Sequence, residues 1–111
     1  MQSCIFCKII KGEIPANIRY EDDDFVAFDD IKPKAKTHIL IVPRRHIHSL
    51  SATQKKDEVI LSKLLLTAKN LAQKEGLESY RLVLNSGRDA GQEVDHLHLH
   101  LLGGNKLGGI A

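Results

Sequence analysis

Hydrophobic and polar residues alternate most regularly near the end of the chain, over residues 94–102. Successive side chains of a strand point to opposite faces of a sheet, so a period of two predicts a strand here. One face of this strand carries leucines and is expected to supply core. The other face carries three histidines: His96, His98 and His100.

A period of three to four residues begins after Ser51 and predicts a long amphipathic helix. We expect a capping box formed by Ser51 and Gln54 at its start, with Thr53 as an alternative cap. Gly76 is expected to end the helix, because glycine adopts the left-handed conformation that closes many helices. The apolar stripe predicted to face the core consists of Ile60, Leu61, Leu64, Leu65, Ala68, Leu71 and Ala72.

Shorter segments complete the predicted order of elements. They are a short helix over Cys4–Lys11, a hairpin of strands over Ile18–Glu21 and Phe25–Phe28, and strands over His38–Val42 and Tyr80–Leu84. The sequence therefore predicts an α+β fold: a five-stranded antiparallel sheet with one long helix on one face and a short N-terminal helix. Nothing in the sequence divides the chain, so we expect one domain over residues 1–111.

Composition narrows the classes of function. The chain has 111 residues, of which 42% are hydrophobic and 27% are charged, as in ordinary globular domains. A net charge of +2 and only 5% aromatic residues argue against nucleic-acid binding, which favours clustered cations and stacking rings. The sequence contains no apolar run long enough for a membrane span and no signal-peptide pattern. We therefore expect a cytoplasmic protein that binds neither nucleic acid nor membrane.

Three interpretations of the histidine row are open on the residues alone. The histidines could be polar side chains of a half-exposed strand, metal ligands, or a nucleophile with supporting acid and base groups. Neutral imidazole can attack phosphorus and form a covalent intermediate that breaks down readily. A glycine-containing loop over residues 87–92 precedes the strand and is suited to presenting N–H groups to an anion. This context favours the nucleophile.

The histidine row lies within a longer motif. Residues 96–102 read His-Leu-His-Leu-His-Leu-Leu, which resembles the His-φ-His-φ-His-φ-φ signature of the histidine triad superfamily, where φ is an apolar residue. The segments 9–15 and 28–43, and the two glycines at 103–104, also resemble this family, so the resemblance covers nearly the whole chain. The sequence is most similar to the branch of histidine triad nucleotide-binding proteins, which act as purine nucleoside phosphoramidases.

The resemblance implies a role for each of four histidines. His98 resembles the nucleophile that attacks the α-phosphorus and carries a transient nucleotidyl group. His100 resembles a phosphate contact and the proton donor to the leaving amine. His38 and His96 resemble the supporting histidines that orient and polarise the nucleophile. The implied reaction is hydrolysis of the P–N bond of a purine nucleoside 5′-phosphoramidate, with adenosine preferred and no cofactor required for catalysis.

The resemblance also implies which residues bind the nucleotide. Asp30 resembles the carboxylate that accepts hydrogen bonds from the ribose hydroxyls, with Ile31 against the base. Asn85 resembles a contact of the phosphate or leaving group, and Gly91 and Gln92 resemble the phosphate side of the site. The chemistry agrees with this assignment, because a carboxylate suits a cis-diol and an apolar wall suits a purine.

The resemblance further implies a homodimer, in which two five-stranded sheets join into one sheet of ten strands. Two alternative functions would use the same histidines. One is a purine-nucleotide-binding regulatory module whose turnover is incidental, and the other is a dinucleoside polyphosphate hydrolase. The short glycine-rich end and the lack of an extended substrate-binding insertion favour the phosphoramidase over the second alternative.

The only two cysteines form a C-x-x-C pair, Cys4 and Cys7. One interpretation is two buried, apolar-like side chains. The other adds His46 and His96 to give a Cys₂His₂ set for a tetrahedral structural zinc ion, and a similar set occurs in some histidine triad proteins. Zinc binding would take the His96 ring out of acid and base chemistry.

Overall fold

The structure, a computed structural model, describes residues 4–109. In chain order it contains α1 (Ile5–Ile10), β1 (Ile18–Glu21), β2 (Phe25–Asp29), β3 (Thr37–Pro43), α2 (Glu58–Lys74), β4 (Tyr80–Val83) and β5 (Leu99–Gly103). The five strands form one antiparallel sheet in the order β1-β2-β3-β5-β4. This architecture confirms the α+β class, the antiparallel sheet and both helices expected from the sequence.

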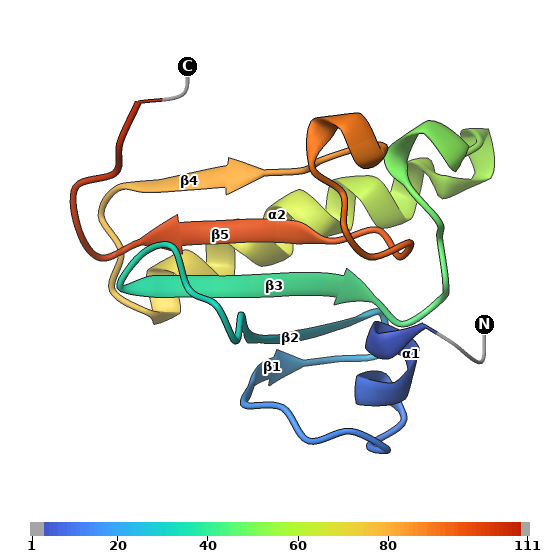
Figure 1. Ribbon diagram of the computed structural model, residues 1–111, viewed down its shortest axis with the longest axis horizontal. Helices are drawn as coiled ribbons and strands as arrows, with labels where there is room; N and C mark the ends of the chain where they lie inside the picture. The colour runs from blue at the N-terminus through green and yellow to red at the C-terminus, as the bar shows by residue number, and fades with distance from the viewer. Residues whose placement is uncertain (1–3, 110–111) are drawn as a thin grey trace.

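Two helices pack on opposite faces of the sheet. Figure 1 shows α2 running behind the strands, while the short α1 lies near the end of β3 and the N-terminus. None of the helices described between residues 4 and 109 is long and apolar enough to cross a membrane.

The two faces of the sheet belong to two separate apolar clusters. Alternate residues of the strands point to opposite faces, so neighbouring residues of β2 and β3 enter different clusters. The cluster beneath α2 includes Ala27, Ile39, Ile41, Leu64, Ala68, Leu97, Leu99 and Leu101. The cluster beneath α1 consists of Phe6, Val26, Phe28, Leu40 and Val42. The leucines between the triad histidines therefore face α2, as the alternation predicts.

The long helix begins later than the sequence predicts. Residues 50–52 and 55–57 form short 3₁₀ turns, and α2 starts at Glu58. The predicted capping box at Ser51 is wrong, because the Ser51 hydroxyl instead contacts the Ser86 hydroxyl at 2.8 Å. The carboxylate of Asp57 accepts the backbone N–H three residues earlier at 2.8 Å and so caps this region.

The apolar stripe of α2 is narrower than predicted. Leu64, Ala68, Leu71 and Ala72 are buried, as expected, but Leu65 is 55% exposed. The assignment of Leu65 to the core-facing stripe is therefore wrong.

The last strand begins at Leu99, five residues after its predicted start at residue 94. Ladder pairing between β3 and β5 stops at Ile41 and Leu99. Continued pairing would bring Pro43 opposite Leu97, but proline has no N–H to donate. The N–H of Leu97 instead donates to the carbonyl of Ile47 at 2.6 Å. The alternation of side chains continues through residues 96–98 without a strand ladder.

The predicted end of α2 at Gly76 is confirmed. Gly76 has φ +74°, and its N–H donates to the carbonyl of Gln73 at 3.1 Å. The N–H of Leu77 donates to the carbonyl of Ala72 at 2.9 Å. These two bonds form the Schellman motif, which satisfies carbonyls at the helix end.

We predict that Gly76→Ala lowers the free energy of unfolding by about 1 kcal/mol, because a Cβ is unfavourable in left-handed backbone. No atom lies within 4 Å of a Cβ placed at this position, so the cost would come from the backbone alone. Urea denaturation of both proteins measures the difference. Gly108→Ala is the matched control, since an added Cβ there also meets no atom within 4 Å and Gly108 lacks a positive φ. Equal losses in both variants would contradict the prediction.

Candidate active site

The three histidines of the triad divide between two places. The ring centroids of His98 and His100 lie 5.1 Å apart, and the ring of His100 faces that of His38 at 5.2 Å. The ring of His96 lies against His46 instead, with the centroids 4.8 Å apart. The structure thus brings His38, His98 and His100 together and directs the His96 ring toward a second cluster.

His98 is held in one orientation by its neighbours. Its Nδ1 lies 2.7 Å from the main-chain oxygen of His96, so Nδ1 carries the proton and donates it. The lone pair is then on Nε2, for which residues 4–109 provide no hydrogen-bond partner. Phe6 packs edge-to-face against this ring, with centroids 5.1 Å apart and an interplanar angle of 83°. His98 therefore presents a fixed lone pair, which is what a nucleophile requires.

A second hydrogen-bond chain assigns the proton of His100. The backbone N–H of Lys34 donates to Nδ1 of His38 at 3.0 Å, which leaves the proton of neutral His38 on Nε2. That Nε2 lies 2.9 Å from Nδ1 of His100 and 3.4 Å from Oδ2 of Asp30. Because Nδ1 of His100 accepts this bond, neutral His100 carries its own proton on Nε2. His100 thus offers an N–H donor beside the His98 lone pair.

Burial favours the neutral form of the His38 and His100 rings. Removal from water lowers the pKa of His100 to about 4, and the charges of His98 and His38 act in the same direction. Burial also lowers the pKa of His38, although the Asp30 carboxylate opposes the shift. Near neutral pH both rings are therefore uncharged, as the hydrogen bonds between them require.

Asp30 and Ile31 follow β2 and lie beside this pair of histidines. Oδ1 of Asp30 accepts the N–H of Lys32 at 2.9 Å, while Oδ2 faces His38. Ile31 is 90% exposed, so no part of the described chain covers it. An oriented carboxylate next to an uncovered apolar side chain suits a ligand with one polar and one apolar part.

The rings of His46 and His96 meet the two cysteines of α1 and its N-cap. Sγ of Cys4 lies 3.3 Å from Nδ1 of His96. Sγ of Cys7 lies 3.3 Å from Nδ1 of His46 and 3.6 Å from Nδ1 of His96. A tetrahedral zinc ion with ordinary bond lengths would separate sulfur and nitrogen ligands by about 3.5 Å. All four donor atoms lie within 4.8 Å of one another, so the four side chains fit such an ion.

A second group of side chains, Asp30, His38 and His100, also brings its donor atoms together. The hydrogen bonds of the histidines differ between this group and the cluster that contains the cysteines. Nε2 of His96 lies 2.8 Å from the carbonyl oxygen of Pro43, so Nε2 carries the proton and Nδ1 is free for a metal. His38 has the opposite assignment, because the Lys34 N–H places its proton on Nε2. The cysteine-containing cluster is thus arranged as a ligand set, and the other cluster as a hydrogen-bond relay.

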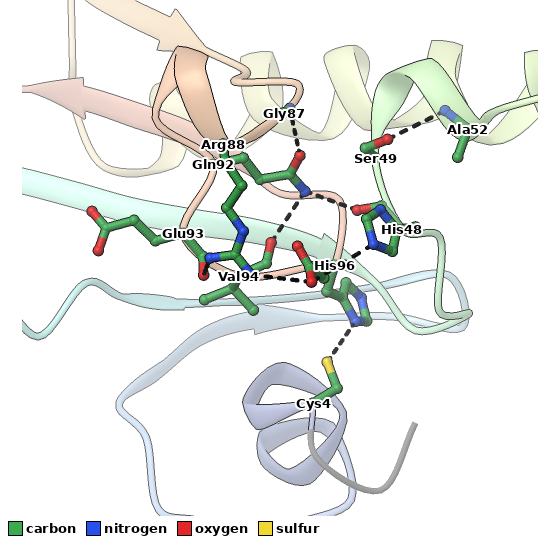
Figure 2. A network of polar contacts seen from close by, with 11 residues as sticks. Cys4, His48, Ser49, Ala52, Gly87, Arg88, Gln92, Glu93, Val94 and His96 are labelled. Atoms are coloured by element: carbon green, nitrogen blue, oxygen red, sulfur yellow. Dashed lines mark hydrogen bonds and ion pairs between the residues drawn. The ribbon is translucent and has the colours of Figure 1, made fainter.

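Gln92 supports the loop that leads into the triad. Figure 2 shows its side chain between backbone groups of three separate residues. Oε1 accepts the N–H of Gly87 at 2.8 Å, and Nε2 donates to the carbonyls of His48 at 2.8 Å and Val94 at 3.1 Å. Gln92 is only 2% exposed. A phosphate contact by Gln92 stays a prediction, and it would require the amide to leave these partners.

Asn85 and Gly91 lie together in the same loop. Gly91 has φ +106°, and a Cβ added there would lie 3.6 Å from Nδ2 of Asn85. Glycine adopts this left-handed backbone without strain, which lets the loop turn back over the Asn85 side chain. The Arg88 guanidinium donates to the Asp95 carboxylate at 3.1 Å and to the carbonyl of Glu93 at 3.1 Å.

A hollow of about 690 Å³ lies elsewhere, between the C-terminal segment and the start of β4. Arg81 and Lys106 are among its lining residues, and none of the triad histidines lines it. The candidate site is therefore located by the chemistry of its side chains and not by this hollow.

Sequence reasoning missed three contributors to the site. The carbonyl of Pro43 and the N–H of Lys34 fix histidine protons, and main-chain groups leave no signal in a residue pattern. Phe6 packs against both His96 and His98. Its position between the two cysteines was the available sign that it would reach this cluster.

Comparisons with known proteins agree with the fold and the histidine arrangement. Residues 3–109 match the family described as scavenger mRNA decapping enzyme C-term binding. A purine nucleoside phosphoramidase of Escherichia coli K12 is 45% identical over 109 residues, covering 96% of this chain and 92% of that protein. An uncharacterized HIT-like protein of Synechococcus elongatus is 50% identical over 107 residues, covering 96% and 94%.

Solved structures give the same result. A HIT family hydrolase from Legionella pneumophila has a TM-score of 0.93 and 49% identity, with 96% of each chain covered. A histidine triad protein from Clostridium difficile has a TM-score of 0.95 and 42% identity, covering 100% of this chain and 98% of that one. Fold and site together define an α+β protein with a histidine-lined face on its sheet. The chain belongs to the histidine triad (HIT) family, which confirms the resemblance seen in its sequence.

We predict that His100 makes stability depend on pH between about 4 and 6.5. Its pKa is about 4 in the folded chain and near 6.5 when unfolded, so the unfolded state binds more protons in this window. The free energy of unfolding should therefore fall as the pH is lowered from 6.5 to 4, by on the order of 3 kcal/mol for this group.

Urea denaturation of the wild type and of His100→Asn across this pH range tests the prediction. Asn keeps an acceptor for the His38 N–H but does not titrate. The variant should lose less stability than the wild type on acidification, and parallel curves would rule out this role for His100.

Proposed function

We propose that this protein hydrolyses the P–N bond of purine nucleoside 5′-phosphoramidates, with adenosine preferred, through a covalent nucleotidyl intermediate on His98. The orientation of His98 carries the proposal: its Nδ1–H is bound to the His96 carbonyl at 2.7 Å, and its Nε2 lone pair has no partner in the described chain. Membership of the HIT family and the 45% identity to a named phosphoramidase support the substrate class.

In the first step, Nε2 of His98 forms a bond to the α-phosphorus, and the substrate P–N bond breaks. The amine leaves with the electron pair of that bond and takes a proton from water. The His98 ring becomes cationic when it carries the nucleotide, and its Nδ1–H then donates more strongly to the His96 carbonyl. In the second step, water attacks phosphorus and the bond from phosphorus to Nε2 breaks, with its electron pair returning to His98. The proton that this water loses neutralises the hydroxide left by the first step, and the nucleoside monophosphate is released.

His100 is assigned to the phosphate oxygens. Its Nε2–H can donate to them and stabilise the charge that develops during each displacement. The relay behind it holds no spare proton, because Nδ1 of His38 accepts the Lys34 N–H and the proton on its Nε2 is already directed at His100. This arrangement favours the phosphate contact over the role of proton donor to the amine.

The nucleoside is assigned to Asp30 and Ile31. The Asp30 carboxylate suits the two ribose hydroxyls, and the uncovered Ile31 side chain suits one face of the base. The phosphate and leaving group are assigned to Asn85 and to the loop at Gly91, which lies close to the Asn85 side chain.

We expect a mass increase of one nucleotidyl group on His98 when turnover of an adenosine 5′-phosphoramidate is quenched and the peptides are analysed by mass spectrometry. His98→Ala should lower kcat by about 10³-fold or more, because it removes the nucleophile. AMP affinity, measured by calorimetry, should change by only a few fold. His48→Ala is the matched histidine control, since that side chain is exposed and lies outside the relay.

Other outcomes point to other functions. Faster turnover of diadenosine polyphosphates than of the phosphoramidate would identify a dinucleoside polyphosphate hydrolase. Tight AMP binding by a wild-type protein that neither turns over nor acquires a nucleotidyl group would identify a binding module and overturn the proposal.

We also propose that Cys4, Cys7, His46 and His96 hold a structural zinc ion. The sulfur–nitrogen distances of 3.3–3.6 Å and the Pro43 acceptor behind His96 support this assignment. Zinc would cross-link α1 to the loop after β3 and to the triad, and four protein ligands would leave it no open position for substrate. A cytoplasmic location, still a prediction, would keep both thiols reduced and available.

A homodimer is the assembly we propose. β4 lies at one edge of the sheet and is paired on one side only within the described chain. Val59, Leu65 and Leu66 leave apolar side chains exposed on α2, which packs beneath the sheet. A second copy that pairs with the β4 edge could bury these side chains and remove the open edge.

Light scattering of the wild type should give twice the chain mass of 12.4 kDa. The double variant Leu65→Glu/Leu66→Glu should shift toward the single-chain mass, because it places charge in an apolar contact. Lys56→Glu, an exposed change in the turn before α2 and away from these leucines, is the control and should stay dimeric. A monomeric wild type would contradict the proposed assembly.

A further inference from the structure

The loop between β2 and β3 carries three lysines at alternate positions, Lys32, Lys34 and Lys36, and all three are exposed. None of them forms an ion pair in the described chain, where the lysines that do so are Lys55 and Lys63. Like charges this close in sequence repel one another, and no carboxylate of the described residues binds their ammonium groups. The loop therefore concentrates positive charge that the chain around it does not neutralise.

Main-chain hydrogen bonds fix this loop against the candidate site. The N–H groups of Lys32 and Lys34 donate to the carboxylate of Asp30 at 2.9 Å and to Nδ1 of His38 at 3.0 Å. The N–H of the third lysine donates to the side chain of Asn105 at 2.6 Å. Figure 1 shows the loop at the end of the sheet where β3 begins and β5 ends. The three side chains thus start from backbone that is bound to the nucleoside and relay groups.

The charge of Lys34 reaches the histidines of the relay. Burial is the main cause that lowers the pKa of His38, and the Lys34 ammonium adds to this effect. For the pKa of His100, burial and the charges of the neighbouring histidines come first, and Lys34 again acts in the lowering direction. A positive charge that disfavours protonation of these rings favours a negative charge placed beside them. The phosphate that we assign to His100 would be such a charge.

We propose that Lys32, Lys34 and Lys36 form a lysine rim that selects ligands of the site by the negative charge of their phosphate. The inference rests on the proposed function for the identity of the ligand as a nucleotide. The rim would act by long-range attraction, which raises association rates and affinity without contact to the reacting atoms. Its effect should therefore appear in KM and in affinity and not in kcat. Salt should weaken the effect, because dissolved ions screen exposed charges beyond about 10 Å at about 0.1 M.

Three ligands that share the adenosine group and differ in charge test this selection. Adenosine is uncharged, and an N-alkyl adenosine 5′-phosphoramidate carries one negative charge. AMP carries nearly two at a pH of about 7.5, because the second pKa of a phosphate monoester is about 6. Calorimetry measures the Kd of adenosine and of AMP, and steady-state kinetics give KM and kcat for the phosphoramidate. Each measurement is made at about 20 mM and about 300 mM NaCl, so that screening differs strongly.

The test variant is Lys32→Gln/Lys34→Gln/Lys36→Gln, which removes three charges and keeps the main-chain N–H groups that hold the loop. A conservative variant, in which arginine replaces the same three lysines, keeps the charge. The matched control removes three charges from exposed lysines before and on α2, which covers the opposite face of the sheet: Lys55→Gln/Lys56→Gln/Lys63→Gln. Circular dichroism and urea denaturation check that every variant is folded.

Coulomb energy is proportional to the charge of the ligand, so the logarithm of each loss should follow that charge. For the test variant at low salt, we expect the Kd of AMP to rise about tenfold and KM of the phosphoramidate about threefold. The Kd of adenosine and the value of kcat should stay within about twofold of the wild type. High salt should bring the losses close to zero. The arginine variant and the matched control should resemble the wild type throughout.

Equal changes in the affinities for AMP and adenosine would overturn the inference, because the loop would then shape the nucleoside site and not attract phosphate. An unchanged Kd of AMP, a loss that persists at high salt, or an equal loss in the matched control would also overturn it. The same holds if the wild type binds no AMP. A wild type that binds AMP but does not hydrolyse the phosphoramidate would contradict the proposed function alone. In that case the two calorimetric affinities still decide whether the lysine rim selects charge.

Discussion

The pairing of β3 with β5 is the interaction on which both the sheet and the candidate site depend. Its register sets Ile39 opposite Leu101 and Leu40 opposite His100, so alternate residues of each strand go to opposite faces. One face is covered by α2, and burial of its apolar side chains provides the main hydrophobic stabilisation of the fold. The same register places His38 and His100 at diagonal positions on the other face, so the geometry of the candidate site and the core share one cause.

Periodicity predicted the elements well wherever side chains alone decide the structure. The leucine and histidine faces of residues 96–101 and the buried positions of α2 followed from spacing. The errors came where a distant partner decides. Residues 94–98 alternate like a strand, but a strand needs a paired neighbour. The pairing of β3 with β5 stops before Pro43 and so does not reach these residues. The start of α2 depends on Asp57, whose carboxylate also pairs with Arg45, a residue far away in sequence.

The identities of the site residues were predictable, but their chemical states were not. The histidine pattern and the family resemblance named His38, His98 and His100, which the structure brings together. Which nitrogen of each ring holds the proton depends on backbone groups of Lys34, His96 and Pro43, and the tertiary fold decides where these groups lie. The separation of the His96 ring from its two triad neighbours has the same origin.

The early end of the β5 ladder has a consequence for how the protein accommodates chemistry. His98 immediately precedes β5 and keeps the side-chain alternation of a strand, while the N–H of Leu97 before it is bonded to the Ile47 carbonyl at 2.6 Å and not to β3. Phosphorus changes from four to five bonded neighbours and back during each displacement, and the attacking nitrogen must follow it over a fraction of an ångström. The His98 ring can follow this change by small rotations about its own side-chain bonds, while the paired strands behind it stay still.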